Sequence, residues 1–167
     1  MAELAPKDRL QPSLLDRLTD ESPGEGMESR EERILSLRQL RKSVIRDLEW
    51  LLNTGCFETS AQELLRFPQV RRSVLNYGIP DITGVMASNT DSKILERSLR
   101  QAIIDFEPRI LPKTLKIEVI IGNEKMNANA IIFEIEGEIW AQPLPERLYL
   151  KTILDLELGS FQFPHTT

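Results

Sequence analysis

The spacing of hydrophobic residues changes once along this chain, at Pro108, and this change constrains the fold more than any other feature. Before Pro108, apolar residues recur every three or four positions, which is the period of a helix with one buried side. After it, they alternate with polar residues, which is the period of a half-buried strand. The chain is therefore expected to form helices first and strands second, in an α+β fold.

Two main helices are expected before Pro108. The first starts at a capping box formed by Ser29 and Glu32 and ends near Leu52. Its stop is expected at residues 53–55, where glycine tolerates a left-handed backbone. Its apolar stripe comprises Ile34, Leu37, Leu40, Val44, Leu48 and Leu51, and its Arg38, Arg41, Lys42 and Arg46 are expected to form a solvated basic face.

The second helix is expected to begin near Asp91 or Ser92 and to end at Glu107, because proline cannot continue a helix. Between the two helices, residues 57–81 are expected to form short helical turns, interrupted at Pro68 and at residues 77–81. The apolar side of the second helix comprises Ile94, Leu95, Leu99, Ala102, Ile103 and Phe106.

Three alternating segments follow, and the short linkers between them predict antiparallel neighbours. Gly137 is expected to form a bulge that lets the middle strand reach Trp140. The predicted fold has two main helices packed on a small antiparallel sheet of three to four strands. The strand faces are Leu115, Ile117, Val119 and Ile121; Ile131, Phe133 and Ile135; and Leu148, Leu150, Leu154, Leu156 and Leu158.

Residues 1–28 are expected to form a mobile N-terminal arm, and residues 29–167 a single domain. The arm is rich in proline, glycine and charge, which disfavours a packed core. It contains one apolar cluster, Leu14, Leu15 and Leu18, preceded by Ser13 as a helix cap. This cluster either folds back onto the domain or docks on a partner.

Charge is unevenly distributed along the chain. Residues 1–32 hold four basic and nine acidic side chains, which accounts for the whole net charge of -5. Residues 33–72 carry eight basic and four acidic residues, whereas residues 117–167 carry three and eight. This polarity either orients a subunit between two partners or reflects ordinary solvated faces. The acidic total disfavours nucleic-acid binding as the main function.

Composition excludes several further classes. With one cysteine, Cys56, and one histidine, His165, the chain has no disulfide framework and almost no means of building a zinc site or a histidine-assisted nucleophile. No apolar run is long enough to span a bilayer, and the start of the chain lacks the features of a signal peptide. We therefore expect a cytoplasmic protein with no metal, cofactor or direct membrane insertion.

Glu107-Pro108-Arg109 is the most unusual local chemistry in the chain. Proline forces Glu107 out of helical geometry and leaves its carboxylate at the negative end of a helix dipole, where it requires a partner. Arg109 can bind that carboxylate through two hydrogen bonds within the chain. Alternatively, the rigid turn directs one or both charges at another protein.

A catalytic interpretation has little support in the sequence. Glycoside hydrolysis needs two carboxylates across a bond, and Asp105, two residues before Glu107, points to a different side of the helix. We find no catalytic residue pattern, phosphate-binding glycine loop or metal-ligand spacing. A lysozyme-like peptidoglycan hydrolase using Glu107 is kept as the alternative function.

Three segments in order carry a resemblance to a known family: residues 46–54 (RDLEWLLNT), residues 74–81 (VLNYGIPD) and residues 103–109 ending in Glu-Pro-Arg. The chain resembles TssE, the baseplate subunit family of bacterial type VI secretion systems, which belongs to the phage tail baseplate wedge proteins once labelled lysozyme-like. The resemblance covers nearly the whole chain.

The resemblance implies a structural role in a contractile, phage tail-like apparatus. Its implied partners are the wedge proteins TssF, TssG and TssK, the sheath proteins TssB and TssC, and the spike and inner-tube proteins of an assembled baseplate docked at the inner membrane. By the same resemblance, Glu107, Pro108 and Arg109 are expected to contact the baseplate core. Asp47, Asn53 and Gly78 match the shared pattern without an assigned role.

The final strand, from about residue 148 to residue 158, is expected to form a sheet edge. An edge can accept a strand from a sheath subunit through backbone hydrogen bonds. Alternatively, Lys151, Asp155 and Glu157 prevent such pairing.

Overall fold

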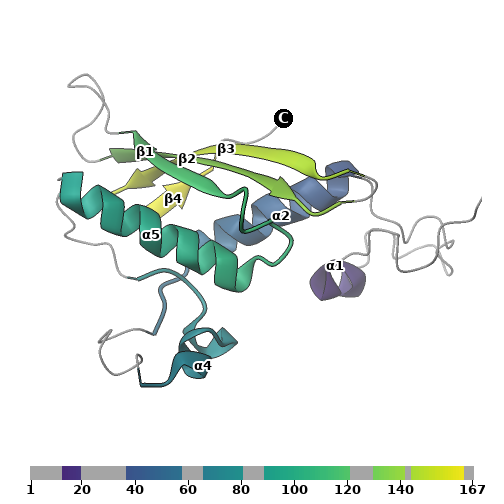
Figure 1. Ribbon diagram of the computed structural model, residues 1–167, viewed down its shortest axis with the longest axis horizontal. Coiled ribbons are helices and arrows are strands. Elements are labelled where there is room, and N and C mark those ends of the chain that lie inside the picture. Colours follow the sequence, from purple (N-terminus) through teal and green to yellow (C-terminus); the bar gives the residue numbers. More distant parts are fainter. Residues whose placement is uncertain are drawn as a thin grey trace, which may run out of the picture.

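Two long helices, α2 and α5, cover one face of a four-stranded antiparallel sheet in the computed structural model (Figure 1). The structure describes residues 13–19, 37–57, 66–80, 89–120, 130–141 and 144–163. The predicted α+β fold is confirmed, and the sheet has the larger of the two expected strand numbers. The helices are α1 (Leu14–Leu18), α2 (Leu37–Leu52), α4 (Pro68–Arg71), the 3-10 turn η2 (Val74–Asn76) and α5 (Asn89–Phe106), and the strands are β1 (Lys116–Ile120), β2 (Ala130–Ile139), β3 (Glu146–Asp155) and β4 (Ser160–Gln162).

Helix α2 ends at Leu52, as its apolar spacing predicts. The predicted capping box at residues 29 and 32 lies outside the described residues. The predicted left-handed stop at Gly55 is wrong, because among the described residues only Gly78 and Gly159 have positive φ. Side chains end the helix instead: the Thr54 hydroxyl donates to the Trp50 carbonyl at 2.7 Å, satisfying a carbonyl left free at the helix end.

Helix α5 begins at Asn89, slightly before the predicted start, and ends at Phe106. Leu99 and Ile103 are fully buried between the helix and the sheet. Between α2 and α5, α4 and η2 form the short helical turns that the sequence predicts, and Figure 1 shows them projecting from the helix side of the molecule. Within the described ranges, no helix has both the length and the apolar character needed to cross a bilayer.

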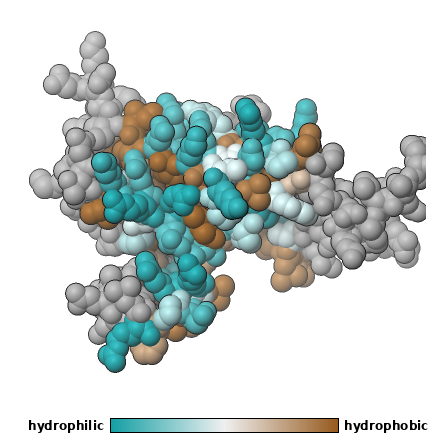
Figure 2. Space-filling view, viewed as in Figure 1, coloured by the Kyte–Doolittle hydropathy of each residue, from teal (hydrophilic) through white to brown (hydrophobic). Residues whose placement is uncertain are grey.

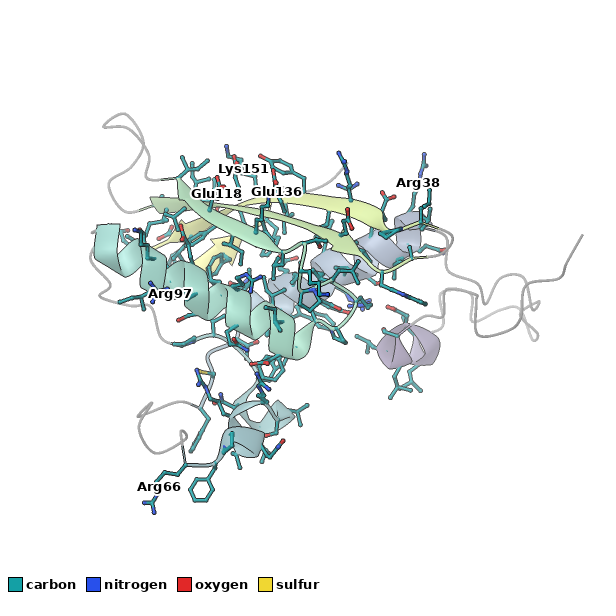
Figure 3. The ribbon with its side chains drawn as sticks, viewed as in Figure 1. Arg38, Arg66, Arg97, Glu118, Glu136 and Lys151 are labelled. Carbon is teal, nitrogen blue, oxygen red and sulfur yellow. The ribbon has the colours of Figure 1, made fainter. Side chains whose placement is uncertain are left out.

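The strands follow one another in chain order, β1-β2-β3-β4, and each pairs antiparallel with its neighbours. Phe133 in β2 lies opposite Val119 in β1 and Thr152 in β3, so inward-facing residues align across the sheet. The charged side chains labelled on the sheet in Figure 3, Glu118, Glu136 and Lys151, point away from the helices. This alternation gives the sheet one core face and one charged face.

The predicted bulge at Gly137 is wrong. Pairing of β2 with β3 is unbroken from Ala130 opposite Asp155 to Ile139 opposite Glu146, and Gly137 lies within it. A Cβ atom at Gly137 would contact the Cγ2 of Ile110 at 3.4 Å. Glycine here therefore gives room for the segment after α5 to pack closely on β2, rather than bending the strand.

The final strand is shorter than predicted. Strand β3 ends at Asp155, and the chain then turns and returns as β4, which pairs with residues 153–155. Leu158 lies in this turn and is exposed, so it does not extend the inward face. The edge of the sheet is consequently the three-residue β4, followed by residues 146–152 of β3, which have no strand beside them on that side among the described residues.

Candidate docking site

The Glu107-Pro108-Arg109 turn is fixed at the point where α5 leads into the sheet. The Glu107 backbone N–H donates to the Ile103 carbonyl at 2.8 Å and completes the last helical turn. The Trp140 N–H then donates to the Arg109 carbonyl at 2.7 Å, next to the bridge that joins Ile110 to Ile139. Backbone hydrogen bonds on both sides therefore hold the turn in one position on β2.

Glu107 and Arg109 form a two-pronged ion pair within the chain. Arg109 Nε donates to Glu107 Oε1 at 2.7 Å, and Arg109 Nη2 donates to Oε2 at 2.5 Å. The Arg109 backbone N–H also donates to Oε1 at 3.2 Å. The Glu107 side chain is 5% exposed and that of Arg109 23% exposed, so the pair is largely buried. Of the two arrangements that the sequence left open, the structure shows the internal pair.

Arg109 also joins the turn to α2. Its Nη2 donates to Asp47 Oδ2 at 2.5 Å, and its Nη1 donates to the Ser43 hydroxyl at 3.2 Å. Burial opposes the charge of Arg109, but the hydrogen bonds and negative charges of Glu107 and Asp47 outweigh it and raise the pKa of the guanidinium. Arg109 therefore stays charged, and the structure gives Asp47 the role that the sequence did not assign.

A second arginine continues these contacts along α2. Arg46 donates to Asp47 Oδ1 through Nε at 2.9 Å and through Nη2 at 2.7 Å, while its Nη1 donates to Asp16 Oδ1 at 2.7 Å. Its guanidinium carbon also lies 5.2 Å from the centre of the Trp50 ring, in cation–π geometry. We call the resulting series of ion pairs the charge chain; its members are Asp16, Arg46, Asp47, Arg109 and Glu107.

The charge chain ends on α1, whose first turn is closed by a capping box. The Asp16 backbone N–H donates to the Ser13 hydroxyl at 3.2 Å, and the Ser13 backbone N–H donates back to Asp16 Oδ2 at 3.3 Å. Burial acts to raise the pKa of Asp16, but its hydrogen bonds with Ser13 and Arg46 and the charge of Arg46 prevail and lower that pKa. Asp16 therefore both caps α1 and attaches it to α2.

The leucines of α1 do not enter the core. Leu14 is 71% exposed, Leu15 42% and Leu18 74%, and Figure 2 shows a hydrophobic surface where α1 lies. Helix α1 contacts the domain through its polar side, at Asp16, while its apolar side remains at the surface. An exposed apolar cluster held in place in this way is typical of a surface that another protein covers.

The site contains two carboxylates, but their surroundings do not suit acid–base chemistry. Asp47 and Glu107 bind the same guanidinium, and every oxygen of the two carboxylates accepts from an arginine, so both groups are committed to pairing within the chain. Asp105 is committed elsewhere, accepting from Gln101 at 2.9 Å and pairing with Arg72 at 3.3 Å. The part of the chain that the structure describes holds no group of three residues suited to bind a metal.

Sequence reasoning missed Asp16, Ser43 and Trp50 as members of this site and treated Arg46 as part of a solvated face. The spacing of Arg46 and Trp50, four residues apart on one helix, is a local signal that could have indicated their contact. No local pattern links Arg109 to Asp47, because 62 residues separate them.

The comparisons with known proteins give the class of the chain. Residues 38–144 match the family model described as baseplate wedge protein gp25, and this match covers most of the sequence. The chain is thus a structural component of a phage tail-like baseplate, and it contacts other baseplate components in that role. It belongs to the gp25 baseplate wedge protein family.

Among solved structures, the chain is similar to that of a candidate tail lysozyme from Geobacter sulfurreducens, determined at 1.44 Å resolution. It is 17% identical in sequence, and the alignment covers 74% of this chain and 95% of that chain with a TM-score of 0.49. No curated protein matches the sequence significantly.

Proposed function

We propose that the chain is a TssE-type baseplate subunit of a bacterial type VI secretion apparatus, in which it links wedge subunits and provides the template for sheath assembly. Membership of the baseplate wedge family supports the general role. The three ordered segments that resemble TssE, ending in Glu-Pro-Arg, support the particular apparatus. TssF, TssG and TssK are then its wedge partners, and the baseplate lies on the cytoplasmic side of the inner membrane.

The observation that carries the proposed contact with wedge partners is the attachment of α1. Three exposed leucines are held on a capped helix, and the charge chain connects that helix to the Glu107-Pro108-Arg109 turn. Apolar side chains held in this way lose little conformational entropy on binding, which favours their use as anchors. Leu14, Leu15 and Leu18 are therefore proposed to insert into an apolar groove on a wedge partner.

The Glu107-Pro108-Arg109 turn is proposed to form the second contact. Pro108 is exposed, whereas Glu107 is buried beneath Arg109. A partner would therefore meet Pro108 and the accessible part of the Arg109 guanidinium, with Glu107 acting as a positioning residue. In this scheme residues 29–167 form the wedge domain and residues 1–28 the arm that carries α1.

The same scheme assigns no hydrolytic reaction to the chain. A hydrolase would need Glu107 to give a proton to a leaving group, and its oxygens are bound by Arg109. Sheath contact is proposed at the edge formed by residues 146–152 of β3, because Asn53 already binds the Phe161 N–H and carbonyl of β4. At the opposite edge, Glu96 of α5 already accepts the Val119 N–H at 3.1 Å, which occupies part of β1.

The α1 contact can be tested with a triple variant, L14S/L15S/L18S, purified together with TssF and TssG. We expect a parental melting curve, because the three leucines are exposed, and loss of co-purification. The matched control is L144S/L158S, since Leu144 and Leu158 are equally exposed elsewhere on the molecule. Normal co-purification of the triple variant and normal sheaths in cells would contradict the docking role of α1.

A further inference from the structure

The connector between α2 and α5 exposes four apolar side chains, although it buries the polar side chain of Asn76. Val74 is 82% exposed and Leu75 77% exposed, and Phe67 and Val70 are exposed beside them. Asn76, in contrast, is buried, with its side-chain NH2 donating to the Arg71 carbonyl at 3.1 Å. This is the reverse of the usual preference, in which apolar residues enter the interior and amides face water.

Hydrogen bonds hold this reversed arrangement in place. The Ser73 hydroxyl donates to the Val70 carbonyl at 2.8 Å and accepts from the Leu75 N–H at 3.3 Å, so it fixes the passage from α4 to η2. At the base of the connector, the Ile79 N–H donates to the Thr54 carbonyl and the Cys56 N–H to the Ile79 carbonyl, both at 2.8 Å. Exposure of the apolar residues is thus built into the fold of the segment.

Two further contacts tie the connector to α5. The rings of Tyr77 and Phe106 meet edge to face, with their centres 5.3 Å apart, and Arg72 pairs with Asp105 at 3.3 Å. The outer part of the connector remains at the surface. Figure 1 shows α4 standing away from the two long helices, and in Figure 3 Arg66 lies at the far end of this projection.

The charged side chains in the outer part of the connector are all basic. Residues 66–76 contain three arginines and no acidic residue, and Arg66 and Arg71 are both exposed beside the apolar side chains. We define the connector patch as Phe67, Val70, Val74 and Leu75 with Arg66 and Arg71. An apolar centre with a basic rim is complementary to a segment in which apolar side chains alternate with Asp or Glu.

We propose that the connector patch is a further docking surface, which binds an acidic, apolar segment of another baseplate protein. It is separate from the charge chain and from α1. The inference depends on membership of the baseplate family, which supplies protein partners, and extends the proposed function by giving a further contact and the chemistry of its occupant. A protein is favoured over an anionic membrane because α4 has only four residues, too few for a helix lying along a lipid surface.

A photo-crosslinking amino acid at Leu75 tests the proposal in the full-length chain assembled with TssF, TssG and TssK. We expect a crosslink to one partner, at a segment containing several Asp or Glu residues among apolar ones. The variant R66E/R71E should weaken binding of that partner by at least roughly tenfold, with a parental melting curve. V74S/L75S should weaken it similarly, whereas the control L144S/L158S, equally exposed elsewhere, should not.

Several results would overturn the proposal. The first is a complex in which Leu14 crosslinks to a partner but Leu75 does not. This result would contradict the connector patch and would leave the proposed α1 contact intact. Crosslinks from Leu75 to a second copy, to the chain's own residues or to a segment lacking acidic residues would overturn it too. The proposal would also be overturned if Leu75 gave no partner crosslink and the purified chain instead floated with phosphatidylserine vesicles, provided that R66E/R71E abolished this flotation. If the parent chain joins no subcomplex, the proposed function fails and this proposal fails with it.

Discussion

Asn53 and Phe161 exchange two hydrogen bonds although 108 residues separate them in the sequence. The Asn53 side-chain NH2 donates to the Phe161 carbonyl at 3.1 Å, and the Phe161 N–H donates to Asn53 Oδ1 at 2.8 Å. One amide thus pairs with the backbone as a neighbouring strand would. It attaches β4, a strand of three residues, to the end of α2, and this is the role of an Asn that the sequence singled out without explanation.

Replacing Asn53 by Ala should lower the free energy of unfolding by about 1–3 kcal/mol, because it leaves two backbone groups of a buried residue without partners. Hydrogen exchange at the Phe161 amide should accelerate more than exchange at Phe133. Glu49→Ala, at an exposed position of the same helix end, is the control and should change stability by less than about 0.5 kcal/mol. Unchanged exchange at Phe161 in N53A would contradict this role.

Gly78→Ala should destabilise the domain by at least about 2 kcal/mol. Gly78 has a φ of +123°, and an added Cβ would lie 2.3 Å from the Thr54 carbonyl oxygen, so both the backbone and the space exclude a side chain. Gly55→Ala is a matched control, because a Cβ there meets no atom within 4 Å. Chemical denaturation of both variants measures the difference, and equal stabilities would show that the segment relaxes freely.

Glu107→Ala should cost about 3 kcal/mol or more, because it leaves Arg109 partly buried with only Asp47 as a charged partner. The outward-directed turn that the sequence left open would have kept the melting curve near that of the parent, whereas the burial of the internal pair predicts a loss of stability. The double variant E107L/R109M should be less destabilised than the sum of its single variants. Additive losses in this cycle would indicate that the two residues act independently.

The attachment of α1 should be insensitive to pH near neutrality and weaken only in acid. The pKa of Asp16 is lowered in the folded protein, so its pairing with Arg46 contributes fully above the ordinary aspartate pKa of about 3.9. That contribution is lost as the pH falls through the lowered folded value. The carboxyl chemical shift of Asp16 and the amide chemical shift of Leu18 should change over the same pH range. The change at Leu18 should be absent in D16N. Release of α1 above about pH 5 would contradict it.

The purified chain should not hydrolyse peptidoglycan. Both oxygens of Glu107 accept from Arg109 and the side chain is 5% exposed, so the carboxylate is turned into the protein and away from any substrate. Release of soluble fragments from purified cell wall should equal the buffer blank. Turnover by the parent that disappears in E107Q, with that variant still folded, would establish a catalytic role for this residue.

The sequence predicted those features of the fold that depend on local periodicity. The apolar spacing in α2 and the alternation in β2 follow directly from which side each element buries, and both were found where expected. The turn after Asp155 was missed because Leu156 and Leu158 continue the same alternation into a segment that leaves the sheet. Periodicity alone cannot show where pairing stops.

The candidate site was predictable only in part, for a related reason. Proline and the helix end indicated that Glu107 needs a partner, and Arg109 lies close enough in sequence to be considered. The contacts of Arg109 with Asp47 and of Arg46 with Asp16 join segments that only the folded chain brings together. The expectation of a bulge at Gly137 was wrong for the same reason. Glycine at this position leaves room for the side chain of Ile110, which comes from another part of the fold.

The position of Arg46 in the charge chain makes the release of α1 independent of the unfolding of the rest of the protein. Arg46 binds Asp47 and the Trp50 ring within α2 itself, and only one of its nitrogens reaches α1. When Asp16 leaves, Arg46 keeps its pairing with Asp47, so no charge is left without a partner on the rest of the protein. Helix α1 can therefore detach while the rest of the protein stays folded as before.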